Sequence, residues 1–321
     1  MKQYTIGVDF GTLSVRAVLV RIRDGSVAAS AEYTYPHGVI SDCLPSGEPL
    51  VREFALQHPM DYWEGLLTII PRIMEKSGAA GDEVAAIGVD FTCSTTLPTL
   101  ADSTPLCTLP AFSHEPNAYV KLWKHHATSQ AQRIEAIARD MHISWLRNSG
   151  GRISPEWPLP KLLQLLEEAP ALFDQTDVYL EAGEWIVWRL TGVLSRSESL
   201  ADSKNLHEKG YPPPAFFARV HPRFENILDR QFRGPVIPLT YPAGGLTDEA
   251  ARLLSLSPGT PVIPAMVDSH AGAPGAGLME PGVLLSVLGT SACHILLSEE
   301  NLDITGIAAK GQDGILTGLC N

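Results

Sequence analysis

A polar bend follows the first β-branched stretch of the chain and carries residues that can bind phosphate. Asp9, Gly11, Thr12 and Ser14 form this bend between two segments with the composition of strands. Glycine lets the backbone approach a ligand closely, and the N–H groups of such a bend, with the Thr and Ser hydroxyls, can hold phosphate oxygens. A carboxylate repels a phosphate unless Mg²⁺ or its waters lie between them, so we expect Asp9 to hold Mg²⁺ through water. A plain β-hairpin explains this stretch about as well when it is taken alone.

A second carboxylate stands at the end of another predicted strand, in the segment 264–272. Asp268 is followed there by small residues that can aim its side chain into a cleft. In phosphoryl transfer to an alcohol, a positioned Asp accepts the hydroxyl proton and aligns the nucleophile. An Asp that only caps the following Ala/Gly-rich helix is a common alternative. The spacing by itself favours the cap.

Several motifs together resemble one protein family. The stretch DFGT at 9–12 resembles the first phosphate loop of the superfamily that contains sugar kinases, actin and the heat-shock ATPases. Further motifs follow in the order found in the FGGY carbohydrate kinases, over the whole chain, and are most similar to the L-ribulokinase branch. One departure is His125, where that branch usually has an acid. The resemblance implies that Asp268 is the catalytic base rather than a cap.

The resemblance also implies the remaining ligand contacts. Residues 288–292 are similar to the second phosphate loop of the superfamily, although a plain turn between strands also fits them. The turn at 90–96 and a lysine near position 204 lie where ribulokinases contact their ketose, although a lone lysine is more often a solvated surface charge. The second set of implied phosphate ligands is Gly289, Thr290 and Ser291, and the implied sugar ligands are Thr92, Cys93, Lys204 and Asp268.

The activity implied by the resemblance is phosphorylation of a primary hydroxyl of a pentulose, with ATP and Mg²⁺ as cofactors. L-Ribulose, converted to L-ribulose 5-phosphate, is the small-molecule substrate we expect, and D-ribulose and xylulose kinases are alternatives. FGGY kinases have two similarly folded halves, of which the second supplies the adenine pocket. We expect residues 1–278 to form the sugar-binding and catalytic domain, and residues 279–321 to begin a nucleotide-binding domain that is truncated. The alternative to an active kinase is a fragment that binds a sugar but has little or no catalytic activity.

The elements that must position these residues follow from hydrophobic periodicity and turn residues. Strands at 4–9, 13–21 and 27–34 are predicted to form an antiparallel meander with an Asp-Gly turn at 24–25. A strand at 84–91 nearly repeats the first, which favours two strands that end at one active-site edge. The other predicted helices are 61–75, 118–140, 160–168, 184–190 and 247–254, and the other strands are 178–180, 262–267, 284–288 and 293–297. The resemblance identifies this α/β order as the ribonuclease-H-like fold of the actin, hexokinase and heat-shock ATPase superfamily, with insertions.

Composition excludes several other classes of function. The 321 residues, 45% hydrophobic and 19% charged, suit a globular protein with room for two domains. The net charge of −12, without a Lys/Arg cluster, argues against a nucleic-acid partner, and no apolar run of about 18 residues predicts a membrane span. Five widely spaced cysteines favour a reducing cytoplasm over a disulfide framework or a zinc site. Motifs of P-loop, dinucleotide-binding, zincin and α/β-hydrolase enzymes are absent, and the oligomeric state stays open, with a homodimer as one expectation.

Overall fold

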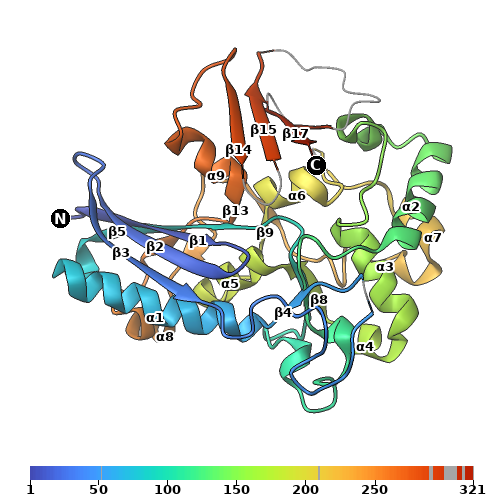
Figure 1. The fold of residues 1–321 in the computed structure, drawn as a ribbon, viewed down its shortest axis with the longest axis horizontal. Coiled ribbons are helices and arrows are strands. Elements are labelled where there is room, and N and C mark those ends of the chain that lie inside the picture. The colour runs from blue at the N-terminus through green and yellow to red at the C-terminus, as the bar shows by residue number, and fades with distance from the viewer. Residues whose placement is uncertain (52, 209, 289–291, 300–308, 313–314, 321) are drawn as a thin grey trace.

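A mixed β-sheet forms the centre of the computed structural model, which describes residues 1–51, 53–208, 210–288, 292–299, 309–312 and 315–320 (Figure 1). Its strands are β1 (Tyr4–Phe10), β2 (Ser14–Arg21), β3 (Val27–Thr34), β5 (Val84–Phe91), β11 (Gly244–Gly245), β12 (Pro261–Val262) and β13 (Met266–Val267). The order is β11-β12-β5-β1-β2-β3, and β13 also pairs with β5. The first three strands are antiparallel, whereas β5, β12 and β13 run parallel to β1 or to one another. An antiparallel meander thus continues into parallel strands.

The predicted meander is confirmed almost to the residue. Alternate residues of β1 are buried, as expected for a strand with one face on a core. The turn between β2 and β3 contains Gly25 with φ 70°, in the left-handed region that glycine adopts readily. Asp24 stabilises this turn, because its carboxylate accepts hydrogen bonds from the N–H and the hydroxyl of Ser26.

The near-repeat of β1 in β5 has a direct structural meaning. The two strands pair in parallel with the repeated residues in register, so that Asp9 lies opposite Asp90. The last residues of the two strands, Phe10 and Phe91, stack with ring centroids 4.9 Å apart in the core. The prediction that both strands end at one edge of the sheet is therefore confirmed.

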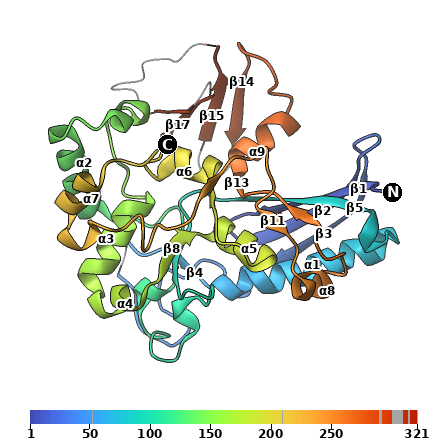
Figure 2. The same ribbon diagram turned by 180° about the vertical axis from the view of Figure 1, so that it is seen from behind.

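Helices α1 (Pro59–Ser77), α5 (Ala182–Thr191) and α8 (Asp248–Leu254) contact one another and cover one face of the sheet (Figures 1 and 2). α1 begins after His58, whose ring accepts the Met60 N–H, and ends at Gly78 with φ 68°. Thr247 caps α8, since its hydroxyl accepts the Ala250 N–H at 3.1 Å. Apolar side chains of these helices and of the sheet form the first buried core.

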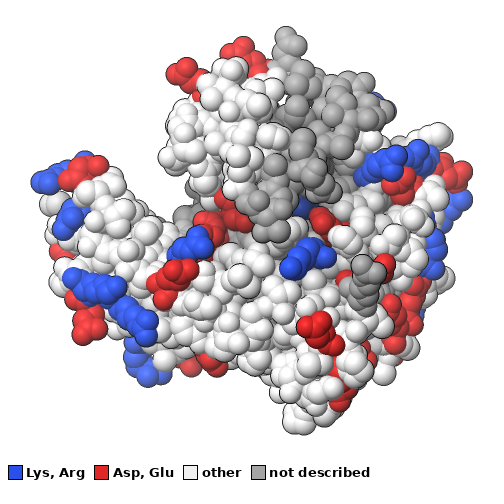
Figure 3. Space-filling model, viewed as in Figure 1, with Lys and Arg blue, Asp and Glu red and all other residues white. Residues whose placement is uncertain are grey.

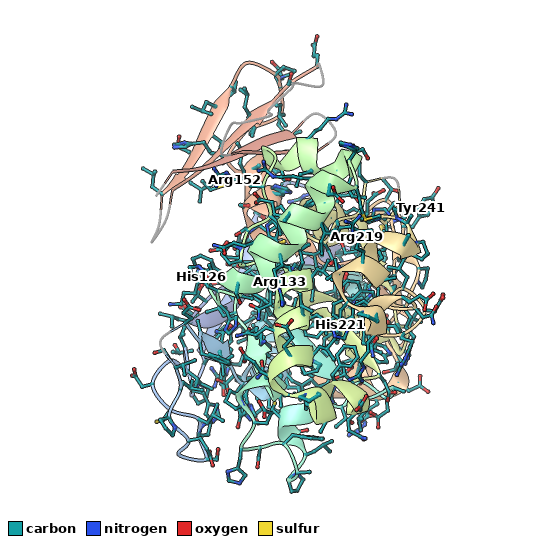
Figure 4. The ribbon with its side chains drawn as sticks, turned by 90° about the vertical axis from the view of Figure 1, so that its right-hand side faces the viewer. His126, Arg133, Arg152, Arg219, His221 and Tyr241 are labelled. Carbon is teal, nitrogen blue, oxygen red and sulfur yellow. The ribbon has the colours of Figure 1, made fainter. Side chains whose placement is uncertain are left out.

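A second, mainly helical lobe has a core of its own. Its helices are α2 (Thr128–Asp140), α3 (Pro158–Glu168), α4 (Pro170–Gln175) and α7 (Pro214–Val220). A small sheet lies beside them, with the order β4 (Leu56–Gln57), β7 (Val120–Lys121), β6 (Thr96–Thr99) and β8 (Val178–Glu181). Figure 4 shows Arg133 and Arg219 on the outer face of this lobe, where Arg219 pairs with Asp140 at 2.6 Å.

The predicted helix over 118–140 is wrong in its first part. Residues 120–121 form β7, whose backbone pairs with β4, and the helix begins only at Thr128. Sheet pairing there overrides the helical spacing of the apolar residues. His125 lies in the intervening turn and is fully buried, with its Nε2 2.7 Å from Gln164 Oε1. The predicted strand 262–267 is likewise divided into β12 and β13, because Pro264 between them has no N–H to donate.

The last described strands form a separate sheet. Its order is β14 (Leu284–Leu288), β15 (Ala292–Leu297), β17 (Ile315–Cys320) and β16 (Ala309–Gln312), of which only β14 and β15 were predicted. α9 (Asp268–Gly275) connects β13 to this sheet and packs against β15 through Ala273 and Ile295. Three short elements, α6 (Glu198–Lys204), β9 (Arg196–Ser197) and β10 (Val236–Ile237), complete the fold near the site. Within the described ranges, no helix has both the length and the apolar composition to cross a bilayer.

Candidate active site

Three carboxylates lie at one edge of the central sheet, where β1, β5 and β13 end. Asp9 and Asp90 are paired residues near the ends of their strands, and Asp268 directly follows β13, which pairs with the end of β5. Open α/β sheets bind their ligands beyond the carboxyl ends of the strands. The sequence predicted Asp9 and Asp268 for this edge but not the role of Asp90. The repeat of β1 in β5 is the pattern that indicates it, since it places an Asp at the same register position.

Of the three acids, Asp90 has the pKa that the fold raises most. Burial raises the pKa of Asp90 to about 9, and the charge of Asp9, a hydrogen bond with Asp9 and the charge of Asp268 act in the same direction. Asp90 is therefore a neutral carboxylic acid at neutral pH. Its Oδ1 is buried without a hydrogen-bond partner in the described part of the chain.

Asp268 is the first residue of α9, and its side chain binds a backbone N–H of the first helical turn. The N-cap position belongs to Val267, and Asp268 Oδ1 accepts the N–H of Ser269 at 2.7 Å. Burial raises the pKa of Asp268 and the charge of Asp9 adds to this effect, whereas the Ser269 N–H and the charge of Lys204 oppose it. A carboxylate with a raised pKa accepts a proton more readily than an ordinary one. The contact with Ser269 is one that a capping Asp makes, and the raised pKa is one that suits a base, so the geometry is consistent with both roles.

The first predicted phosphate loop is held by the small sheet of the helical lobe. The Gly11 N–H donates to the Ser14 carbonyl at 3.0 Å, which closes the bend. Gln57 donates to the Thr12 carbonyl at 2.7 Å, and the Trp123 indole N–H donates to the Thr12 hydroxyl at 3.1 Å. Gln57 ends β4 and Trp123 follows β7, so both contacts come from another lobe. Sequence reasoning missed both residues, because no local pattern marks them.

Two of the predicted ligands in this loop have partners of their own. The buried Ser14 hydroxyl donates to Glu32 at 2.7 Å. Asp9 pairs with Arg16 on the neighbouring strand at 3.5 Å, and Arg16 also reaches Glu32 at 3.3 Å. A phosphate at Ser14 or Mg²⁺ near Asp9 would have to displace these contacts. The displacement of the ion pairs costs little, because exposed pairs contribute roughly 0–1 kcal/mol.

Predicted sugar ligands gather around Lys204, the last residue of α6. Burial acts to lower the pKa of Lys204, but electrostatic interactions with neighbouring ionisable side chains outweigh burial and the pKa is raised. These groups are Cys93, Glu156, Glu181 and Asp268. Thr92, one residue before Cys93, shares a 2.8 Å hydrogen bond with Thr95. The structure therefore brings Lys204, Cys93 and Asp268 together, with Thr92 adjacent in the same turn.

The second predicted phosphate loop, Gly289, Thr290 and Ser291, lies outside the described residues, between β14 and β15. On the face shown in Figure 3, the described charged side chains are mixed in sign and form no continuous basic surface. The same view shows a notch between the meander and the C-terminal sheet. This face therefore has a concave region but not the charge of a nucleic-acid interface.

A pocket of about 470 Å³ lies between α6 and α9. Met266, His270 and Ile295 are among its lining residues, whereas Asp9, Asp90 and Asp268 are not. Its lining is mainly apolar. The two carboxylates in it, Glu198 and Asp202, are not the three that act on one another at the sheet edge. We therefore place the candidate active site at the carboxylate edge and not in this pocket.

Among the described residues, one group has the residue types of a transition-metal site. The ligand atoms of His37, His58 and Asp61 lie within 4.8 Å of one another. His37 Nδ1 is 2.7 Å from the Asp61 carboxylate, and His58 accepts the Met60 N–H at the start of α1. These bonds fix the beginning of α1, so a structural role accounts for the group.

Comparison with known proteins adds sequence relatives over almost the whole chain. The model of the FGGY family of carbohydrate kinases, N-terminal domain, matches residues 4–275. A ribulokinase from Geobacillus thermodenitrificans is 44% identical over 321 residues, which cover 99% of this chain and 57% of that protein. A ribulokinase from Mycolicibacterium smegmatis is 41% identical over 322 residues, with the same coverage of 99% and 57%. The chain thus spans about 57% of the length of these curated relatives.

Solved structures agree on the fold at lower sequence identity. The xylulose kinase from Rhodospirillum rubrum has a TM-score of 0.75 at 19% identity, over 98% of this chain and 59% of that one. The gluconate kinase from Lactobacillus acidophilus has a TM-score of 0.72 at 19% identity, with the same coverage of 98% and 59%. The predicted ribonuclease-H-like α/β fold is therefore confirmed. Together with the sequence match, it shows that this chain belongs to the FGGY family of carbohydrate kinases.

Proposed function

We propose that this chain provides the sugar-binding and catalytic part of an ATP-dependent kinase that converts L-ribulose to L-ribulose 5-phosphate. The observation that carries the proposal is the convergence of Asp9, Asp90 and Asp268 at the sheet edge, with Lys204 acting on Asp268. Relatives named ribulokinase, 41–44% identical over nearly the whole chain, support the choice of sugar. Kinases of xylulose share the fold, so D-ribulose and xylulose are the substrates to compare.

Asp268 is the catalytic base in this proposal. A sugar hydroxyl is a poor nucleophile, and a carboxylate that orients its oxygen and accepts its proton lowers the barrier. The raised pKa of Asp268, caused mainly by burial, suits this role. Lys204 offers three N–H donors to sugar oxygens beside it. The turn with Thr92 and Cys93 supplies the remaining sugar contacts.

Mg²⁺ fits the carboxylate edge. It prefers oxygen ligands and keeps several of its waters, so Asp9 can hold it through water. The unpartnered Oδ1 of Asp90 is a further oxygen at the same edge, and a nearby cation favours the ionised form of that acid. When bound, Mg²⁺ neutralises charge on the phosphoryl group that is transferred. The proposed phosphate ligands are Gly11, Thr12, Ser14, Gly289, Thr290 and Ser291.

We also propose a domain boundary near residue 278, with residues 1–278 as the sugar-binding and catalytic domain and 279–321 as the start of the nucleotide-binding domain. In the described residues, the sheet of β14 to β17 pairs with no strand of the central sheet, which supports this division. A cytoplasmic location agrees with the free thiols of Cys43, Cys93, Cys107 and Cys293. A homodimer stays a prediction.

An assay of ADP release with a panel of pentuloses tests the proposal. The chain is compared with full-length Geobacillus ribulokinase, with and without Mg²⁺. We expect turnover to be faster with L-ribulose than with the other pentuloses and to require Mg²⁺. Faster turnover of D-ribulose or xylulose selects the other kinases, and ketose binding by calorimetry without turnover selects a sugar-binding fragment. No binding of any pentulose contradicts the proposal.

A further inference from the structure

Two buried ionisable side chains bind the backbone N–H and the backbone carbonyl of Ser94. Its N–H donates to Glu181 Oε1 at 3.1 Å, and its carbonyl accepts the Lys161 Nζ at 2.6 Å. Glu181 is 2% exposed and Lys161 is 0% exposed. Ser94 itself has φ 66°, in the left-handed region that a residue with a Cβ rarely adopts. Two buried hydrogen bonds thus stabilise a backbone conformation that is unfavourable for Ser94 alone.

The two charged groups are themselves anchored on different elements. Lys161 lies on α3 and also donates to the Leu122 carbonyl, after β7, at 2.8 Å. Glu181 ends β8 and caps α5, so its position is set by the start of that helix. The Ala182 N–H donates to the Thr95 carbonyl at 2.7 Å, which fixes the next peptide of the same turn. The shape of the turn 92–96 therefore depends on α3 of the helical lobe, on β8 of the small sheet and on the start of α5.

We propose that Lys161 and Glu181 are positioning residues that hold the 92–96 turn in the shape that binds the sugar. The inference rests on the proposed sugar site at Thr92, Cys93 and Lys204. Neither residue needs to touch the sugar, because each acts through the peptide of Ser94. Preorganised contacts reduce the cost of ordering a loop when a ligand binds.

The charges around the turn support this role. Burial raises the pKa of Glu181 to about 8 and the charge of Glu184 adds to this, whereas Lys161, the Ser94 N–H and Lys204 oppose it. Burial lowers the pKa of Lys161 to about 7, against the charges of Glu181 and Glu156. Glu181 thus interacts with both Lys161 and Lys204, and Lys204 acts in turn on Asp268. Ionisable groups that act on one another thus extend from the turn to the proposed base.

A matched pair of lysine variants separates positioning from general stability. Lys121 is also buried, and burial lowers its pKa to about 7, but its Nζ donates to the Lys161 carbonyl and to Gln164 and not to the turn. Calorimetry of L-ribulose binding is expected to show a Kd about tenfold higher for Lys161→Met, and a change below about twofold for Lys121→Met. If Lys161→Met and Lys121→Met raise the Kd equally and lower the melting temperature equally, the proposal is overturned.

Glu181 allows a conservative rescue. Glu181→Gln keeps an oxygen that accepts the Ser94 N–H, whereas Glu181→Leu has no acceptor. The Kd for L-ribulose is expected to rise about tenfold in the Leu variant and clearly less in the Gln variant. Equal Kd values in the two variants overturn the role assigned to this hydrogen bond.

Thiol labelling tests the turn without any sugar. Cys93 and Cys107 are both buried, at 5% and 3% exposure, but only Cys93 lies in the turn. In Lys161→Met, iodoacetamide is expected to modify Cys93 at least about fivefold faster than in the parent, with Cys107 unchanged, as read by mass spectrometry. Equal acceleration at both cysteines indicates global loosening and contradicts the inference. If the parent binds no pentulose, the proposed function fails, and faster labelling of Cys93 alone would still show that Lys161 holds the turn.

Discussion

The three carboxylates at the sheet edge show how environment assigns different chemistry to one residue type. Asp9 is 41% exposed in its side chain and faces Arg16, whereas Asp90 is surrounded by protein and by two other acids. Asp268 lies between these extremes, with Lys204 opposing the effect of burial. One edge thus offers a partly exposed carboxylate, a neutral acid and a candidate base. Their separation follows from burial and charge alone.

Replacement of Asp268 by Asn tests the base at this scale. The amide keeps the size and one acceptor of the carboxylate but cannot take the proton, so kcat is expected to fall by roughly 10²–10⁴-fold. Sugar affinity should change little, since the amide oxygen can keep the ground-state hydrogen bond. The ADP-release assay with L-ribulose measures kcat, and a thermal unfolding experiment measures the melting temperature of the variant. A fall in kcat of less than tenfold contradicts the assignment.

Replacement of Asp90 by Asn tests its unusual protonation. The folded protein binds this proton up to about pH 9, whereas an unfolded Asp releases it near its ordinary value of 3.8. The stability that Asp90 contributes is therefore complete below the lower pKa and is lost as pH rises through the higher one. Asn cannot ionise, so the Tm of the variant should fall less than that of the parent when the pH is raised from about 5 to about 8.5. In buffer without metal, the difference between the two decreases in Tm is expected to be at least about 2 °C. Parallel Tm curves would show that the pKa of Asp90 is ordinary.

At the scale of elements, the site depends on how closely α1 packs against the meander. Gly65 of α1 faces β2 and β3, and a Cβ there would lie 2.6 Å from Val15 Cγ1 and 2.9 Å from Tyr33 Cδ1. Val15 and Tyr33 are opposite each other on the two strands. The absence of a side chain at Gly65 therefore lets the helix approach the strands that carry the first phosphate loop.

A Gly65→Ala variant should consequently be less stable. Overpacking costs typically 1–3 kcal/mol and exceeds the gain in helix propensity, which is below about 1 kcal/mol. Denaturant unfolding is expected to give a net loss of about 1–2 kcal/mol. Gly272→Ala in α9 is the control, because no atom lies within 4 Å of the new Cβ, and it should be neutral or stabilising. Equal losses in the two variants would mean that packing at Gly65 is not limiting.

At the scale of the whole molecule, we expect this chain to supply more of the sugar contacts than of the nucleotide contacts. The turn 92–96, Lys204 and Asp268 all lie in described elements. The chain, however, spans about 57% of the length of its curated relatives. By family resemblance the adenine pocket belongs to the second half of such kinases. The chain should therefore recognise a ketose better than a nucleotide.

Calorimetry on residues 1–321 measures this difference directly. Binding of L-ribulose is expected with a measurable Kd, whereas ATP with Mg²⁺ should bind with a Kd at least about tenfold weaker than in full-length Geobacillus ribulokinase. The full-length relative serves as the positive control for both ligands. An ATP affinity of the chain equal to that of the relative would show that the adenine contacts lie within these residues.

The sequence by itself determined the elements whose patterns are local. Strand composition rich in β-branched residues and the Asp-Gly turn predicted β1, β2 and β3 to within a residue or two, and the repeat at 84–91 indicated the shared edge. The positions of Asp9 and Asp268 at strand ends were predicted from the sequence, whereas their expected roles as metal ligand and base came from the family resemblance. Family resemblance, more than periodicity, identified the order of these elements as ribonuclease-H-like.

Only the tertiary structure decided how the site is supported. Ser94 is separated by 67 residues from Lys161 and by 87 from Glu181, and Thr12 by 111 from Trp123. Partners so distant leave no periodic pattern in the chain, since they are set by the packing of different elements. The helix predicted over 118–140 was wrong for the same reason, because its first residues pair with β4. The neutral state of Asp90 likewise depends on burial and on charges from two other strand ends, which are properties of the folded protein.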